Sequence, residues 1–68
     1  MITYYKLFDM LNRRHMTVEE LRTAIGASSS TMSKMRQNKI VSLDVIARIC
    51  DTLDCQPGEI MENEKENL

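Results

Sequence analysis

The chain has 68 residues, of which 43% are hydrophobic and 28% charged, and its formal net charge is −1. A chain of this length forms one domain at most, which excludes a doubly wound sheet, a barrel and a two-lobed enzyme. The three aromatic residues all lie in the first eight positions, so we expect an aliphatic, methionine-rich core made by packed helices.

The near-neutral net charge conceals two halves of opposite sign. Residues 1–50 hold eight basic and four acidic side chains, a net of +4, whereas residues 51–68 hold one basic and six acidic side chains, a net of −5. A basic body suits a polyanionic partner, and an acidic end argues against indiscriminate attraction to polyanions. Composition therefore leaves the choice of partner open.

Cysteine content and apolar runs indicate the compartment. Two cysteines do not make the disulfide framework of a small secreted protein. Residues 1–8 lack the apolar stretch of a signal peptide, and unbroken apolar runs reach only two or three residues, far short of a membrane span. We expect a cytoplasmic protein in a reducing setting, without a membrane partner.

Helical spacing and capping residues predict the first two helices. Leu7, Met10 and Leu11 lie at i, i+3 and i+4, which predicts a helix over about residues 4–14. Thr17 and Glu20 have the spacing of a capping box, which starts a second helix of about eight residues. Gly26 ends it, because glycine adopts the left-handed conformation of a helix end at least cost.

A third helix is expected from Ser28, its N-cap, to about Gln37, with Met32 and Met35 on its inner face. A turn follows at residues 38–39.

Ser42 caps a fourth helix, and Pro57 begins a short fifth helix over Pro57–Met61. The buried stripe of the fourth helix is expected to comprise Leu43, Ile46, Ile49, Cys50 and Leu53. Residues 1–3 should be extended or frayed, with weak strand pairing as an alternative, and Asn63–Leu68 should be a frayed, solvated end.

These elements predict an all-α fold, a compact bundle of four helices plus a short fifth. We expect one domain over residues 1–62, containing a helix-turn-helix at 17–37, and an acidic frayed C-terminal tail over residues 63–68.

The helix-turn-helix spacing predicts a steep angle between the second and third helices, which lets the third enter a DNA major groove, about 12 Å wide. The alternative is a plain helical hairpin with a solvated outer face. The exposed positions of the third helix should be Ser29, Ser30, Ser33, Lys34 and Gln37.

From Leu7 to Met61 the chain resembles the lambda Cro/repressor-type (XRE-like) helix-turn-helix DNA-binding domain. The resemblance is carried by T-V-E-E-L-R-T-A-I-G-A-S-S-S-T-M-S-K-M-R-Q-N-K and by S-L-D-V-I-A-R-I-C-D-T-L-D-C-Q-P-G-E-I. It implies a lambda-repressor-like domain of five helices, usually a transcriptional regulator that acts as a dimer.

The resemblance also implies which residues contact DNA. Base edges would be contacted by Ser29, Ser30, Ser33 and Lys34. Backbone phosphates would be bound by Thr17, Ser28, Gln37, Asn38 and Lys39. Because hydroxyls discriminate bases weakly, such a helix predicts modest specificity, aided by water and DNA shape.

Three residues depart from the family pattern, one of them Gln56, which precedes Pro57 where members often have a serine cap. Arg22 stands where members commonly have a small residue, so its stem should lie along the surface with its head in solvent or on a phosphate. Val18 stands where glutamine often touches a phosphate, which weakens that contact.

No residue set indicates an enzyme, a metal site or a cofactor. His15 has no second ligand nearby in sequence, and Cys50 and Cys55 lack the C-x-x-C spacing. Cys50 should pack in the core. The serines have no plausible base and orienting acid.

We therefore expect a sequence-specific DNA-binding transcriptional regulator, most simply a small repressor that occludes a promoter. It would bind double-stranded DNA as a homodimer on half-sites about one helical turn apart, with the fifth helix and the N-terminal aromatics as the dimer surface. The alternative is an antitoxin or a protein-interaction subunit that holds a protein partner, with the acidic tail folding on a basic surface.

Overall fold

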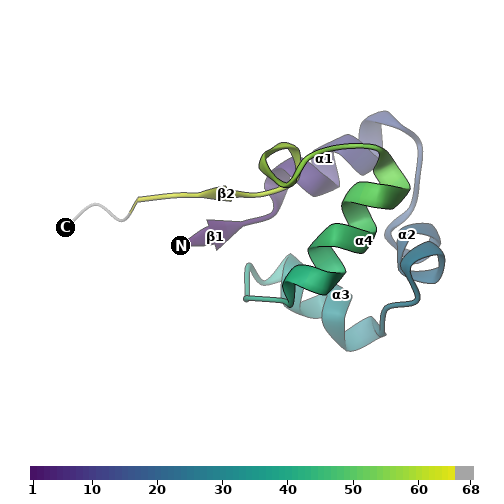
Figure 1. The fold of residues 1–68 in the computed structure, drawn as a ribbon, viewed down its shortest axis with the longest axis horizontal. Coiled ribbons are helices and arrows are strands. Elements are labelled where there is room, and N and C mark those ends of the chain that lie inside the picture. Colours follow the sequence, from purple (N-terminus) through teal and green to yellow (C-terminus); the bar gives the residue numbers. More distant parts are fainter. Residues whose placement is uncertain (66–68) are drawn as a thin grey trace.

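The structure is a computed structural model and describes residues 1–65 (Figure 1). Its elements, in chain order, are β1 (Ile2–Thr3), α1 (Tyr5–Arg13), α2 (Val18–Ile25), α3 (Ser29–Arg36), α4 (Leu43–Leu53), a 3-10 turn η1 (Pro57–Glu59) and β2 (Glu62–Asn63). The helices gather into one bundle, from which the two short strands extend on one side, as Figure 1 shows. The expected all-α bundle is confirmed, with a small strand pair added.

Side-chain caps explain where the helices begin. The Ser28 hydroxyl accepts the Thr31 N–H at 3.1 Å, and the Ser42 hydroxyl accepts the Val45 N–H at 3.2 Å. Each bond satisfies an amide that has no partner within its own helix. The predicted starts of α3 and α4 are confirmed, and α1 lies within one residue of its predicted bounds at each end.

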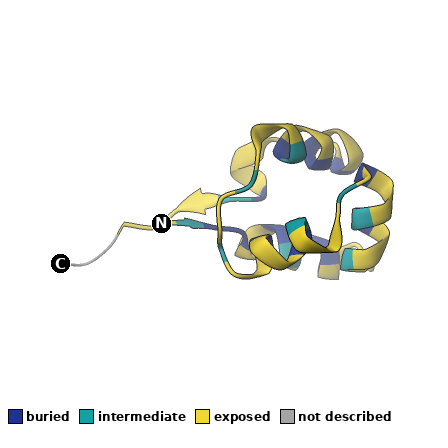
Figure 2. Cartoon of the chain, turned by 90° about the horizontal axis from the view of Figure 1, so that it is seen from below, coloured by how far each residue is buried: buried dark blue, intermediate teal, exposed yellow. Residues whose placement is uncertain are grey.

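Apolar side chains from every helix meet in one core, and the outer helix surfaces are exposed (Figure 2). The buried hydrophobic residues are Tyr4, Leu7, Leu11, Leu21, Ile25, Met32, Met35, Ile46, Ile49, Cys50, Leu53 and Ile60. Only one of them is aromatic, so the predicted aliphatic, methionine-containing core is confirmed, as is the packing of Cys50 within it.

The prediction for Leu43 is wrong. Its side chain is 78% exposed, although Ile46, Ile49 and Leu53 on the same helix are buried. Leu43 is the first residue of α4, directly after the Ser42 cap. Helical spacing places it on the stripe, but the core begins only one turn later.

The predicted fifth helix is also shorter than expected. Backbone bonds from Ile60 and Met61 return to the Pro57 carbonyl, and the regular segment ends at Glu59. The Glu59 carboxylate accepts the Gln56 N–H at 2.8 Å, which fixes the start of the turn. The turn therefore delivers Ile60, which is fully buried, to the core without a full helix.

The prediction that the chain is frayed from Asn63 onward is wrong for Asn63 and Glu64. β1 and β2 pair antiparallel, with Ile2 opposite Asn63. The N-terminal ammonium donates to Asn63 Oδ1 at 3.0 Å and to the Glu64 carbonyl at 2.8 Å. These bonds join opposite ends of the chain, so local sequence does not reveal them. The rest of the predicted tail, 66–68, lies outside the described residues.

The end of α4 is closed by a backbone turn and by an arginine. Asp54 has a φ of +52°, and the Cys55 N–H donates to the Cys50 carbonyl at 3.1 Å. Arg14 Nη1 donates to the Leu53 carbonyl at 2.6 Å. A cation at a helix C-terminus stabilises the carbonyls that lack helical partners, so Arg14 joins the end of α1 to the end of α4.

Candidate nucleic-acid interface

The capping box of α2 has the geometry predicted from Thr17 and Glu20. The Glu20 N–H donates to the Thr17 hydroxyl at 3.0 Å, and the Thr17 N–H donates to the Glu20 carboxylate at 3.0 Å. The second bond stabilises the ionised carboxylate directly, and hydrogen bonding from the backbone and then the side chain of Thr17 lowers the pKa of Glu20. At the other end Gly26 has a φ of +67°, as expected for a left-handed residue between α2 and α3.

Arg22 holds this turn from one side. Its Nη1 donates to the Ala27 carbonyl at 3.1 Å, and its Nε donates to the Glu19 carboxylate at 2.9 Å. This pairing lowers the pKa of Glu19. The head of Arg22 was expected in solvent or on a phosphate, but the structure places it against the loop between α2 and α3.

The four predicted base-contacting residues share one surface of α3. Met32 and Met35 are 3% and 0% exposed and anchor the helix from within. The four residues on the opposite side are all exposed: Ser29, Ser30, Ser33 and Lys34. The structure thus brings them together on a helix whose inner side is fixed, and their role in contacting bases stays a prediction.

The residues predicted to bind phosphates have different surroundings. Thr17 and Ser28 are exposed, with their hydroxyl oxygens engaged in the caps of α2 and α3. Gln37 is exposed, and its Nε2 donates to the Ser33 hydroxyl at 3.1 Å. Lys39 is exposed just after the end of α3. These four remain candidates.

Asn38 also has a structural task, and its binding of a phosphate stays a prediction. Its Oδ1 accepts the Tyr4 N–H at 3.1 Å, its Nδ2 donates to the Tyr5 hydroxyl at 2.9 Å, and its φ is +56°. The neighbouring Lys39 carbonyl accepts the Tyr4 hydroxyl at 2.8 Å. The side-chain amide of Asn38 therefore fastens the end of α3 to the start of α1.

A hollow of about 300 Å³ opens between α2 and α3. Its lining comprises Val18, Glu19, Arg22, Ser29, Met32, Ser33 and Arg36. Arg36 was not singled out from the sequence. Arg36 lies three residues after Ser33 and seven after Ser29. This helical spacing would have placed it on the same side of α3 as the two serines.

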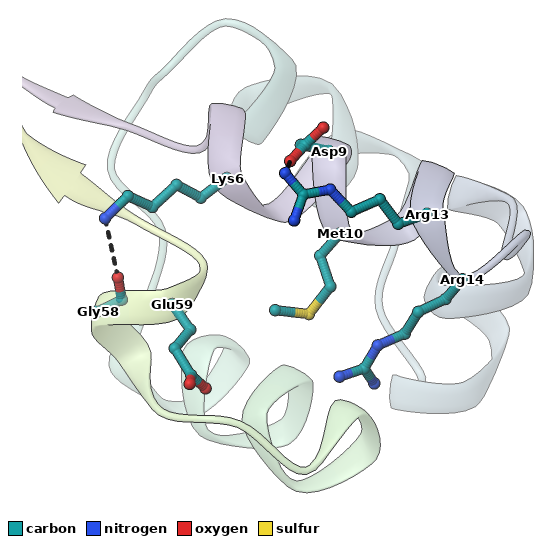
Figure 3. Close-up of a pocket in the computed structure, with 7 residues that line it drawn as sticks. All are labelled: Lys6, Asp9, Met10, Arg13, Arg14, Gly58 and Glu59. Atoms are coloured by element: carbon teal, nitrogen blue, oxygen red, sulfur yellow. Dashed lines mark hydrogen bonds and ion pairs between the residues drawn. The ribbon is translucent and has the colours of Figure 1, made fainter.

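A second hollow, of about 510 Å³, lies between α1 and η1 (Figure 3). Its three cations already have partners. Lys6 Nζ donates to the Gly58 carbonyl at 3.2 Å, Arg13 pairs with Asp9 at 2.6 Å, and Arg14 donates to α4. With Asp9 and Glu59 as its carboxylates, the charged side chains of this hollow sum to +1, and each of its three cations donates to a group within the protein.

Within residues 1–65 no group of three or more histidine, cysteine or acidic side chains is placed to hold a metal ion. Cys50 and Cys55 are free thiols at the end of α4. Burial, followed by the neighbouring Cys50, raises the pKa of the Cys55 thiol, which disfavours the reactive thiolate. In the same part of the chain no helix has the length and apolar character needed to cross a membrane.

Comparison with known proteins agrees with this geometry. The Cro/C1-type HTH DNA-binding domain family matches residues 6–66. An uncharacterized HTH-type transcriptional regulator of Bacillus subtilis (strain 168), YozG, is 36% identical over 55 residues, which cover 78% of this chain and 66% of YozG. The crystal structure of the transcriptional regulator VanUg superposes with a TM-score of 0.91 at 43% identity, covering 96% of this chain and 87% of that one. With a capped α2, a left-handed Gly26 and an exposed polar α3, this chain belongs to the family of Cro/C1-type helix-turn-helix DNA-binding domains.

Proposed function

We propose that this protein is a sequence-specific transcriptional regulator that represses by binding double-stranded DNA and blocking access to it. The observation that carries the proposal is the α3 surface. Four exposed polar side chains, Ser29, Ser30, Ser33 and Lys34, lie opposite two buried methionines. A helix with this division can enter a major groove without disturbing its own packing.

Lys34 is the strongest base-contacting candidate, because an ammonium group can donate to guanine O6 and N7. Serine hydroxyls fit several bases, so Ser29, Ser30 and Ser33 contribute less discrimination. Lys39, which follows α3, is assigned to the DNA backbone, where its charge acts on every sequence alike.

The proposed assembly is a homodimer on two half-sites about one helical turn apart. The segment predicted as a fifth helix is left out of the proposed dimer surface, because Ile60, which follows η1, is fully buried. Three exposed apolar side chains are the better candidates: Tyr5 at 57%, Ile40 at 73% and Leu43 at 78% exposure. The Asn38–Tyr5 bond brings the first of them beside the loop that carries Ile40.

Selection of bound sequences from a random DNA library tests the proposal with the full chain. Enrichment of a two-fold symmetric site is expected. Absence of any enriched sequence would overturn the proposal and favour the alternative, a subunit that holds a protein partner.

Three lysine variants then test the residue roles on the selected site and on random DNA. Lys34→Ala should weaken the selected site more than random DNA, whereas Lys39→Ala should weaken both equally. Lys65→Ala removes the same charge from the acidic end of the chain and is the matched control. Equal losses on both DNAs for Lys34→Ala would contradict its role in contacting bases.

A further inference from the structure

We propose that the hollow between α2 and α3 is the binding site of one DNA backbone phosphate, with Arg36 as its cation and Phe8 as the residue that positions Arg36. This inference rests on the proposed function. It identifies the chemical group that would occupy the hollow, whose lining includes two of the predicted base-contacting residues, Ser29 and Ser33.

The two arginines that line the hollow differ in what they already bind. Arg22 donates to the Glu19 carboxylate and to the Ala27 carbonyl, so its charge is neutralised and three of its five N–H donors are engaged. Arg36 is exposed and donates no hydrogen bond to residues 1–65, nor does it form an ion pair with any of them. The uncompensated charge of the hollow is therefore that of Arg36.

Phe8 fixes where that charge lies. Arg36 Cζ is 5.5 Å from the centroid of the Phe8 ring, within the range of a cation–π contact. A cation–π interaction of this kind uses none of the five guanidinium N–H groups as hydrogen-bond donors. Phe8 is half-buried on α1, so a part of the protein outside the helix-turn-helix holds the cation ready for an anion.

The remaining lining fits a singly charged anion with two free oxygens. Ser29 and Ser33 lie on the same side of α3 as Arg36, at the spacing of successive helical turns. The Ser33 oxygen accepts a hydrogen bond from Gln37 Nε2, which leaves the hydroxyl proton of Ser33 available to donate. A phosphodiester offers one negative charge and two such oxygens, and guanidinium groups bind it in a bidentate manner.

The position of the hollow favours a backbone phosphate over a base. It lies between α3 and α2, whose first residue, Val18, belongs to the lining. A helix inserted into a groove has phosphates along its sides and base edges in front of it. Arg36 should therefore add affinity on every sequence.

The test compares Arg36→Ala with Arg13→Ala on the selected site and on random DNA, across a series of salt concentrations. Both variants remove one exposed arginine, but Arg13 pairs with Asp9 and lines the other hollow. Arg36→Ala should lose about tenfold in affinity on both DNAs. The slope of log affinity against log salt should also fall by about 0.9. Arg13→Ala should keep the slope of the unmodified protein.

Phe8→Leu tests the positioning role, because it retains every charge. A loss of about two- to fivefold with an unchanged salt slope is expected. Thermal melts of each variant check folding, and Arg36→Gln replaces Arg36→Ala if the alanine variant does not fold.

Two failures are distinguishable. If the unmodified protein binds no DNA, the proposed function fails. If it binds but Arg36→Ala matches Arg13→Ala in affinity and slope, the phosphate site is overturned and the function stands. Loss confined to the selected sequence would likewise overturn it, because Arg36 would then contact a base.

Discussion

At the scale of single residues, Asn38 connects the helix-turn-helix to the rest of the molecule. Its side chain binds the Tyr4 N–H and the Tyr5 hydroxyl, and its backbone is left-handed. Asparagine tolerates this conformation better than most residues with a Cβ. One residue thus turns the chain after α3 and ties α3 to α1.

Asn38→Ala is expected to lower the free energy of unfolding by about 1–3 kcal/mol, because the Tyr4 N–H loses its partner. Asn38→Gly loses the same bonds but adopts a positive φ freely, so it should be more stable than Asn38→Ala by about 1 kcal/mol. Urea denaturation of both variants measures the contribution of the hydrogen bonds and that of the positive φ separately. An unchanged midpoint for Asn38→Ala would contradict the assignment.

The contacts of a side chain could be predicted from the sequence only where its partner residue is close in the chain. The Thr17–Glu20 box spans three residues and was predicted correctly. The Phe8–Arg36 contact joins residues 28 positions apart, and nothing local marks it. The polar side of α3 was predictable because it needs only helical spacing, whereas the position of Arg36 beside it depends on a ring distant in sequence.

At the scale of elements, caps set the boundaries and packing sets the exposure. Ser28 and Ser42 bond amides three residues ahead, so the starts of α3 and α4 follow from the sequence. The exposure of Leu43 does not follow from the sequence, because it depends on how far the neighbouring helices reach along α4. The length of η1 likewise depends on packing. A helix was predicted over Pro57–Met61, but the regular segment is a 3-10 turn that ends at Glu59, and Ile60 enters the core.

The capping box makes the stability of α2 depend on pH. Hydrogen bonds from Thr17 lower the pKa of Glu20 in the folded state, so its contribution is fully present above the unfolded pKa. It is lost as pH falls through the folded pKa. Melting temperatures of the unmodified protein and Glu20→Gln from about pH 6 to about pH 2 check this. The unmodified protein should lose more stability on acidification, and parallel losses would contradict the assignment.

At the scale of the whole molecule, the strand pair closes the chain. β1 and β2 hold residues 2–3 against residues 62–63, and further bonds reach Glu64. The fully buried Thr3 and the core residue Tyr4 directly follow Ile2. The strand pair therefore guides the first buried residues into the bundle, although the strands themselves lie at its edge.

A chain truncated after Glu62 should be less stable than the full chain by about 1 kcal/mol, or roughly 4–8 °C in melting temperature. Truncation after Lys65 keeps every contact described here and is the matched control. Calorimetry of both chains checks the difference. Equal melting temperatures would show that the strand pair adds nothing to stability.

The junction at Asn38 has a practical consequence for spectroscopy. The protein has two tyrosines and no tryptophan, and both tyrosine hydroxyls are hydrogen-bonded at this junction. Intrinsic tyrosine emission therefore originates where the start of α1 meets the end of α3. Without any dye or engineered fluorophore, the intensity of this emission reports whether α3 stays docked on α1 during titration or heating.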